Sequence, residues 1–189
     1  MGVAADLTTP RLRLRRWRPE DREPFAALNA DPEVMEHFPS VLSLAESDAL
    51  VDRIEAHFEN HGFGPWVAEH SGVFIGFVGL AVPRFETSFT PCVEIAWRLA
   101  RPSWGRGLAT EGAHAALAFG FDHLGLDEIV AFTVPGNVRS RRVMEKLGMS
   151  YAQDFEHPLI PEGHPLRRHV LYRLKRDADM QSGQLCNKA

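Results

Sequence analysis

The stretch VFIGFVGLAV, residues 73–82, constrains the fold of this chain more than any other stretch. It carries no charged side chain, and such a continuous apolar run is typical of a strand that is buried on both faces of a sheet. We therefore expect a central strand here. Gly76 and Gly79 interrupt the run, and we interpret them as bends or as points where another element packs closely.

The patterns around this run predict one mixed α/β domain. Apolar residues at periods of two or of three to four predict strands over 11–18, 63–69, 92–99, 128–134, 151–155 and 169–175, and helices over 20–30, 33–37, 44–60, 108–123 and 138–146. Ser43 and Glu46 match a capping box at the start of one helix. We expect residues 1–176 to form a single domain and the polar segment 177–189 to be a disordered tail.

Composition excludes several classes of protein. A chain of 189 residues with a formal net charge of −4 shows no basic field, so no nucleic-acid partner is expected. No apolar run approaches the roughly 20 residues that a membrane span needs, and the first residues lack a signal-peptide pattern. The two cysteines, Cys92 and Cys186, have neither metal-ligand nor disulfide-framework spacing. We therefore expect a cytoplasmic protein without a membrane partner.

The sequence WGRGLATEG, residues 104–112, follows a predicted strand and opens a predicted helix. Gly105 and Gly107 let the backbone approach a ligand because they have no Cβ. The first N–H groups of a helix lack internal partners and lie at the positive end of its dipole, so this turn can bind a phosphate or pyrophosphate. The alternative is an ordinary strand-to-helix turn. The stretch matches neither the P-loop nor the dinucleotide-binding glycine motif.

A second strand–turn–helix unit follows at TVPGNVRSRRVMEKLGM, residues 133–149. Asn137 stands where an N-cap belongs, and Ser140 lies at the entry to the helix. Two polar helix starts are therefore expected side by side. Their pairing favours a ligand site over a simple turn.

At these positions the chain resembles the GNAT (Gcn5-related) N-acetyltransferases and, within them, the RimJ/RimL-like branch. The resemblance is carried by EIAWRL (94–99), WGRGLATE (104–111), Asn137 with Ser140, EKLGM (145–149) and DPEV (31–34), and it covers about residues 12–175. It implies a single-domain α/β fold. The central sheet would be twisted, mostly antiparallel, splayed at the cofactor site and flanked by about four helices.

The resemblance implies acetyl-CoA as cosubstrate. The family wraps the pyrophosphate with a motif that Gly107, Leu108 and Ala109 match, whereas Trp104 replaces its usual polar first residue, as is common in the RimJ/RimL-like branch. The pantetheine arm would lie along the splayed strand. The residues that we expect at the cofactor are Trp97, Arg98, Leu99, Trp104, Gly105, Arg106, Gly107, Leu108, Ala109, Thr110, Asn137 and Ser140. For Arg106, a solvated surface position is the alternative.

The resemblance also implies acyl transfer by direct attack of an amine in a ternary complex. Glu94 is the expected general base, because burial beside the cofactor would raise its pKa; the alternative is a structural carboxylate paired with an arginine. Many family members use a tyrosine at the leaving thiolate, where this chain has Met144. We therefore assign the thiolate to Ser140. Asn137 would order a water or contact the pantetheine, and plain helix-start roles are the alternatives for both residues.

The acceptor is expected to be a primary amine, either a protein N-terminal α-amine or a small-molecule amine. Acidic residues in segment 30–38 and helix 44–60 would favour a cationic amine, with a solvated helix face as the alternative. His157, His164 and His169 lie around one late loop without metal-ligand spacing, so no metal site is expected. A non-catalytic acetyl-CoA-binding module and a nucleotide-binding domain are the other classes. Homodimers are common in the family.

Overall fold

The apolar run forms strand β4 (Val73–Ala81) inside an eight-stranded sheet. The computed structural model describes residues 6–176, so the expected tail lies outside the described residues. The other strands are β1 (Leu7–Thr8), β2 (Leu12–Arg15), β3 (Pro65–His70), β5 (Glu94–Leu99), β6 (Glu128–Thr133), β7 (Ser150–Glu156) and β8 (Arg168–Lys175). The helices are α1 (Arg22–Ala30), α2 (Leu44–His61), α3 (Leu108–Ala118) and α4 (Val138–Lys146). The expected α/β fold is confirmed.

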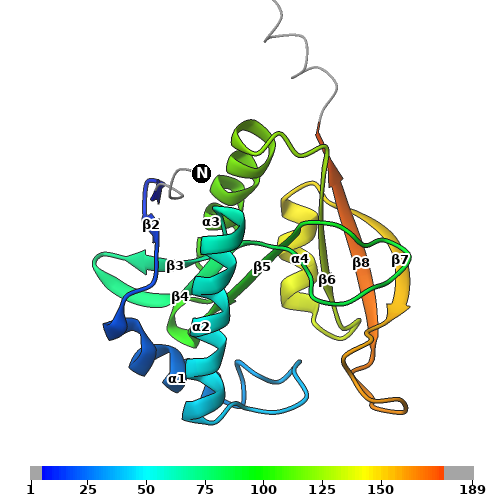
Figure 1. Cartoon of the computed structure of the whole chain (residues 1–189), viewed down its shortest axis with the longest axis horizontal. Coiled ribbons are helices and arrows are strands. Elements are labelled where there is room, and N and C mark those ends of the chain that lie inside the picture. Colours follow the sequence, from blue (N-terminus) through cyan, green and yellow to red (C-terminus); the bar gives the residue numbers. More distant parts are fainter. Residues whose placement is uncertain (1–5, 177–189) are drawn as a thin grey trace, which may run out of the picture.

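The sheet has the order β1-β2-β3-β4-β5-β6-β8-β7, and every pair is antiparallel except β5–β6. That parallel pair is registered at a single position, Glu94 opposite Val130. Beyond it the two strands separate, and this is the expected splay. Figure 1 shows α1 and α2 beside the β2–β4 part of the sheet and α4 beside β6.

Strand β4 shows which helix covers which face. Phe77 contacts the ring of Phe25 in α1, with 6.1 Å between the ring centroids. The next residue, Val78, lies against α3, where a Cβ on Gly112 would approach it to 3.3 Å. Because successive strand residues point to opposite faces, α1 covers one face of the sheet and α3 the other.

A row of four cross-strand partners runs under α1: Arg15, Val67, Phe77 and Arg98, from β2 to β5. Its central members are apolar and buried, and an arginine stands at each end. Arg15 donates to both carboxylate oxygens of Asp21, at 2.7 and 2.8 Å, and to Glu69 at 2.8 Å. Asp21 is the residue that precedes α1, so this ion pair ties the start of α1 to β2 and β3.

Local sequence signals account for the helix ends. At the start of α2, Ser43 Oγ accepts the Glu46 N–H and the Glu46 carboxylate accepts the Ser43 N–H, which confirms the capping box. The helix ends at Gly62, whose φ of 75° is left-handed. The expected helix over 33–37 was wrong: these residues form turns, and Asp31 Oδ1 accepts the Glu33 N–H there. The expected helix over 108–123 ends at Ala118 and continues as one π-helical turn.

Candidate active site

Strand β5 has one paired edge and one open edge. The Val93 C=O accepts an N–H from β6 (2.9 Å) just where the two strands meet, and the Ala100 N–H donates to β4 (2.9 Å). Backbone groups alternate in direction along a strand, so the Ile95 C=O and the backbone groups of Trp97 and Leu99 point into the gap, whereas the Ile95 N–H belongs to the bridge with β6. The open edge therefore offers a row of backbone donors and acceptors to an extended ligand.

Arg98 departs from the expected arrangement. Its C=O points to β4, because a Cβ on Gly76 would lie 2.0 Å from that oxygen. The Arg98 backbone is thus paired within the sheet and does not face the gap. Its side chain, on the α1 face, is the part of the residue that lines the cavity described below.

The glycine turn ends at the start of α3. Gly105 and Gly107 have φ values of 70° and 77°, a left-handed conformation that other residues rarely adopt. Side chains cap α2 and α4, whereas α3 begins at Gly107 without a side-chain cap. The Glu111 N–H makes the first helical bond, to the Gly107 C=O at 3.0 Å. The N–H groups that precede it at this helix start lack helical partners and stay available to a ligand.

Arg11 stabilises the glycine turn by hydrogen bonds to residues 106 and 111. It donates to the Arg106 C=O at 3.0 Å and to the Glu111 carboxylate at 2.6 Å. Thr9 donates to the same carboxylate at 2.6 Å. The Arg106 side chain itself is exposed.

Trp104 closes the far end of the open strand edge. Its indole N–H donates to the Leu99 C=O at 2.6 Å, and the Arg139 guanidinium lies 4.3 Å from its ring centroid. A tryptophan at this position thus fixes the strand end to the glycine turn.

The gap and the glycine turn open into one cavity of about 850 Å³. Its walls come from β4, β5, the 31–43 loop, α2, the β4–β5 loop and the starts of α3 and α4. Every expected cofactor residue lines it except Arg106. The cationic side chains in its wall are Arg53, Arg84, Arg98, Arg139, Arg142 and Lys146. Glu94 is the one carboxylate among its lining residues.

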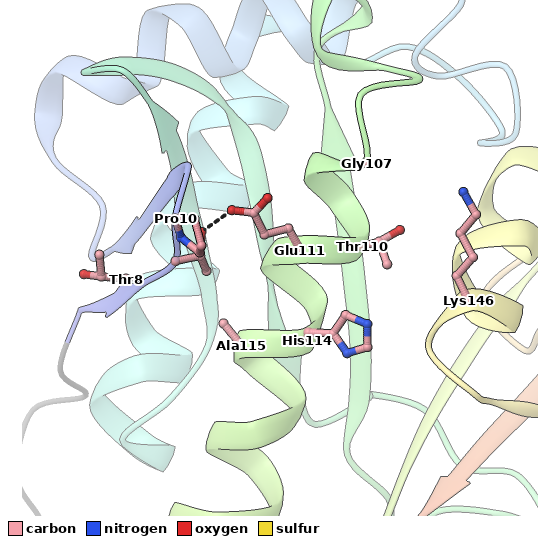
Figure 2. Close-up of a pocket in the computed structure, with 9 residues that line it drawn as sticks. Thr8, Pro10, Gly107, Thr110, Glu111, His114, Ala115 and Lys146 are labelled. Carbon is pink, nitrogen blue, oxygen red and sulfur yellow. Dashed lines mark hydrogen bonds between the residues drawn. The ribbon is translucent and has the colours of Figure 1, made fainter.

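A second hollow of about 680 Å³ adjoins this cavity and shares Gly107, Thr110 and Lys146 with it. Figure 2 shows Thr110 and His114 on the side of α3 that faces Lys146 of α4, and Glu111 on the side that faces Pro10. The hollow therefore extends the cavity along α3 between cationic and hydrogen-bonding side chains.

The start of α4 carries the second polar pair. The Asn137 Oδ1 accepts the Ser140 N–H (3.1 Å), and the Asn137 Nδ2 donates to Thr133 Oγ1 of β6 (3.0 Å). Asn137 is therefore a helix cap that also ties α4 to β6. Ser140 lines the cavity, as does Met144.

Glu94 lies on the α1 face of β5, opposite to Ile95 and Trp97, as expected. Desolvation raises the pKa of its carboxyl to about 7. No salt bridge involves Glu94 among the described residues, so the alternative of a carboxylate paired with an arginine finds no support in this part of the chain. A carboxyl that titrates near neutrality is suited to general-base chemistry.

The sequence predicted a role only for the backbone of Arg98, so the role of its side chain was missed. The guanidinium lies 4.2 Å from the ring centroid of Phe38 and 5.6 Å from that of Phe77. Its Nη1 donates to Asn29 Oδ1 at 2.5 Å, and its Nε is buried with no hydrogen-bond partner in the described structure. Strand alternation could have placed Arg98 on the face of Glu94, because 94, 96 and 98 point the same way.

The acidic residues expected to attract a cationic amine do not line the cavity, and that expectation was wrong. In α2, Asp48 and Asp52 pair with Arg22, and Glu55 and Glu59 pair with Arg16. In the preceding loop, Asp31 and Glu33 pair with Arg101. These carboxylates are already neutralised by arginines, whereas α2 presents Leu50, Arg53, Ile54 and His57 to the cavity.

Two histidines that line the cavity, His57 and His157, also make contacts within the fold. His57 contacts the Phe63 C=O through Nδ1 (2.8 Å) and accepts the Val82 N–H through Nε2 (2.9 Å), so its ring is neutral. Burial lowers the pKa of His157 to about 4, and His157 packs on His169 and Phe85. Within residues 6–176, no group of three or more metal-binding side chains is found. None of the helices described there combines the length and apolar character that a membrane crossing needs.

Comparisons with known proteins decide the family. Residues 11–150 match the model of the acetyltransferase (GNAT) domain. The chain belongs to the GNAT acetyltransferase family. Since relatives in this family are named as acetyltransferases, the chain is an acyltransferase, and a non-catalytic or nucleotide-binding module is set aside.

Individual relatives agree with this family. The FsC-acetyl coenzyme A-N(2)-transacetylase of Aspergillus fumigatus is 35% identical over 158 residues, which are 79% of this chain and 66% of that protein. Protein YkkB of Bacillus subtilis is 32% identical over 156 residues, 81% of this chain and 90% of that protein. The crystal structure of an acetyltransferase from Agrobacterium tumefaciens is 25% identical, with a TM-score of 0.75 over 93% of this chain and 97% of that chain.

Proposed function

We propose that this GNAT acetyltransferase transfers the acetyl group of acetyl-CoA to a primary amine by direct attack in a ternary complex. One observation carries the proposal: the uncapped start of α3 and the open edge of β5 face the same cavity. The first suits a pyrophosphate, and the second suits an extended arm that carries amide groups. Acetyl-CoA has both parts and supplies an activated acetyl group as its thioester.

The residues present fit the donor. Backbone N–H groups from Gly105 to Thr110 would bind the pyrophosphate, and Lys146 and Arg142 add positive charge at the same cavity wall. The Ile95 C=O, the Trp97 backbone groups and the Leu99 N–H would pair with the pantetheine amides as a strand does. The name of the Aspergillus relative includes acetyl coenzyme A, which supports the same donor. Trp104 supports the RimJ/RimL-like branch, which we keep as part of the proposal.

Glu94 is proposed as the general base. The attacking nitrogen must lose a proton as its bond to the acetyl carbon forms, and a carboxylate whose pKa is about 7 can take that proton near neutral pH. A backbone N–H on the open edge of β5 would stabilise the oxyanion of the tetrahedral intermediate.

Ser140 is proposed to serve the leaving thiolate. The carbon–sulfur bond breaks as the intermediate collapses, and the Ser140 hydroxyl can donate to the sulfur, which Met144 cannot. Asn137 holds the start of α4 against β6, so it positions Ser140 at the cavity wall. Starting from a neutral amine, the sum of these steps is an amide, the CoA thiolate and one proton taken by Glu94, and the thiolate recovers a proton from solvent when Glu94 releases its own.

Calorimetric titration of CoA into the wild type and two variants tests the donor site. Gly107→Trp should lower CoA affinity at least about 100-fold, because it strains a left-handed residue and fills the anion site. Gly72→Trp is the matched control, since Gly72 has the same φ of 77° and open space around it in the β3–β4 turn. Equal CoA affinity in wild type and Gly107→Trp would contradict the proposed site. Thiol release from acetyl-CoA with a mixed panel of amines then tests transfer.

A further inference from the structure

Arg98 is a partly buried cation that has no carboxylate partner in the described part of the chain, and its Nε is shielded from solvent. Its single side-chain hydrogen bond goes to a neutral amide, that of Asn29, and its Nε makes none. Burying an unpaired charge is costly, so proteins rarely keep one without a use. Burial also lowers the pKa of Arg98 to about 10, in the direction expected for a cation that is desolvated and uncompensated.

Glu94 does not supply the missing charge. It points to the same face of β5, but four residues of strand separate the two Cα atoms by roughly 13 Å. No ion pair joins the two side chains, and desolvation is the one cause that shifts either pKa. The two groups therefore stand apart in one cavity, a base at one point and a free guanidinium at another.

The surroundings fix Arg98 in place before any ligand arrives. Phe38 and Phe77 flank the guanidinium, and Asn29 accepts from Nη1. Asn29 is itself held, because its Nδ2 donates to Ser47 Oγ of α2 at 2.9 Å and both residues are fully buried. Such a preorganised guanidinium with spare N–H donors matches the geometry of a carboxylate.

The wall of the cavity carries further positive charge. Arg53 of α2 and Arg84 of the β4–β5 loop line it, and neither has an acidic partner among the described residues. Leu50, Phe38 and Phe77 supply the apolar wall. A polyamine would meet these arginines with like charge, whereas an anionic group would be attracted.

We propose that the acceptor is a small primary amine that also bears a carboxylate, and that Arg98 binds this carboxylate while the amine faces Glu94. The proposal rests on the proposed function, since it assigns the acceptor end of the same cavity. It names one chemical class, an amino carboxylate with an apolar body. The acceptors chosen for the test differ in the distance between their amine and their carboxylate.

Matched pairs of acceptors test the proposal. Phenylalanine, leucine and 6-aminohexanoic acid are each compared with the corresponding primary amide, by thiol release from acetyl-CoA. In the wild type, kcat/KM should favour at least one acid over its amide, by about 10- to 100-fold, because a charge-assisted hydrogen bond is lost with the amide. In Arg98→Gln the ratio of kcat/KM for the acid to kcat/KM for its amide should fall to about one, while the KM for acetyl-CoA stays unchanged. Comparing the two proteins cancels the difference in amine pKa between acid and amide.

Arg13→Gln is the matched control, because Arg13 is an exposed arginine of β2 that pairs with Asp6 away from the cavity. It should keep the wild-type preference for the acid. Thermal melting of each variant establishes that it is folded.

Three results would overturn the proposal. The first is equal use of acids and amides by the wild type, and the second is a preference for spermidine or a peptide amide over every acid. The third is an Arg98→Gln variant that raises the KM for acetyl-CoA and keeps the acid preference. If CoA fails to bind or no amine releases thiol, the proposed function fails instead. The carboxylate site is then tested by thermal melting: the acids, and not the amides, should raise the melting temperature of the wild type and should leave that of Arg98→Gln unchanged.

Discussion

Two arginines, Arg15 buried and Arg98 partly buried, stand at the two ends of one cross-strand row under α1, and their environments differ. Arg15 donates to Asp21 and Glu69, and these carboxylates raise its pKa. Arg98 donates to the amide of Asn29, and burial lowers its pKa to about 10. Helix α1 thus places a carboxylate over one arginine, at its start, and a neutral amide over the other, in its last turn.

The difference separates a structural charge from a ligand-binding charge. Arg15 lies away from the cavity and joins β2, β3 and the start of α1, so its partners belong to the fold. Arg98 lines the cavity, and the partner that it lacks is, in our account, the carboxylate of the acceptor. A binding site can retain such an unpaired charge because the ligand supplies the compensation.

The largest effect is expected on breaking the structural pair. Arg15→Met should lower the free energy of unfolding by about 3–5 kcal/mol, because Asp21 and Glu69 lose their buried counter-ion. Urea denaturation at pH 7 measures this change. Arg13→Met, at an exposed ion pair, should cost no more than about 1 kcal/mol. If the two variants lost equal stability, Arg15 would not be the structural member of the comparison.

Glu94→Gln tests whether Glu94, which lies on the same face of β5 as Arg98, is a general base or the ion-pair partner of Arg98. We expect kcat/KM to fall about 10²- to 10⁴-fold at pH 8, as is typical when a general base is removed. In the wild type, kcat/KM should rise with pH through about 7, where Glu94 loses its proton, and this limb should vanish in the variant.

The stability of the same variant has a defined sign. The folded-state pKa of Glu94 is raised, so its charge costs stability as the pH rises from its ordinary pKa of 4.5 through about 7. Glu94→Gln should therefore be at least as stable as the wild type at pH 8. A clear loss of stability would mean that Glu94 is an ion-pair partner after all.

Asn29→Asp would give Arg98 the kind of partner that Arg15 has. The new carboxylate would bind the guanidinium, and the Ser47 hydroxyl, which now accepts from Asn29 Nδ2, would turn to donate to it. We expect the KM for an amino carboxylate to rise about 10-fold, consistent with one charge-assisted hydrogen bond, and the KM for acetyl-CoA to stay constant. Steady-state kinetics with both substrates varied decides the matter. An unchanged acceptor KM would argue that Arg98 does not contact the acceptor.

The smallest effect is expected for Arg98→Met in the absence of ligand. Replacing an unpaired, partly buried charge by an apolar side chain of similar length should change the free energy of unfolding by less than about 1 kcal/mol, or raise it. The measurement is the same urea titration as for Arg15→Met. A loss comparable to that of Arg15→Met would show that Arg98 has a structural partner.

The sequence predicted the parts of the fold that depend on neighbouring residues. The apolar run of β4, the Ser43 capping box and the glycine turn before α3 are each encoded within a few positions. The resemblance at EIAWRL and WGRGLATE added the splay of the sheet, which no single segment encodes. The 33–37 segment was the main local failure, because helical spacing over five residues does not outweigh the turn at Asp31.

The acceptor end could not be predicted, because its contacts join residues that are far apart in the chain. Arg98 meets Asn29 across 69 positions, and Asn29 meets Ser47 across 18. The same reason explains the wrong expectation for α2, whose carboxylates find Arg16 and Arg22 on other elements. Sequence reveals that charges are present, and only the packing of α1 and α2 reveals which of them are paired.

Calorimetric titration of the amino carboxylates into CoA-saturated protein tests the central claim most directly, because it reports binding without chemistry. The account predicts that at least one acid binds the wild type, that its amide binds at least about 10-fold more weakly, and that Arg98→Gln removes the difference. Equal binding of acid and amide to the wild type, or an acid that binds Arg98→Gln as tightly as the wild type, would contradict the account.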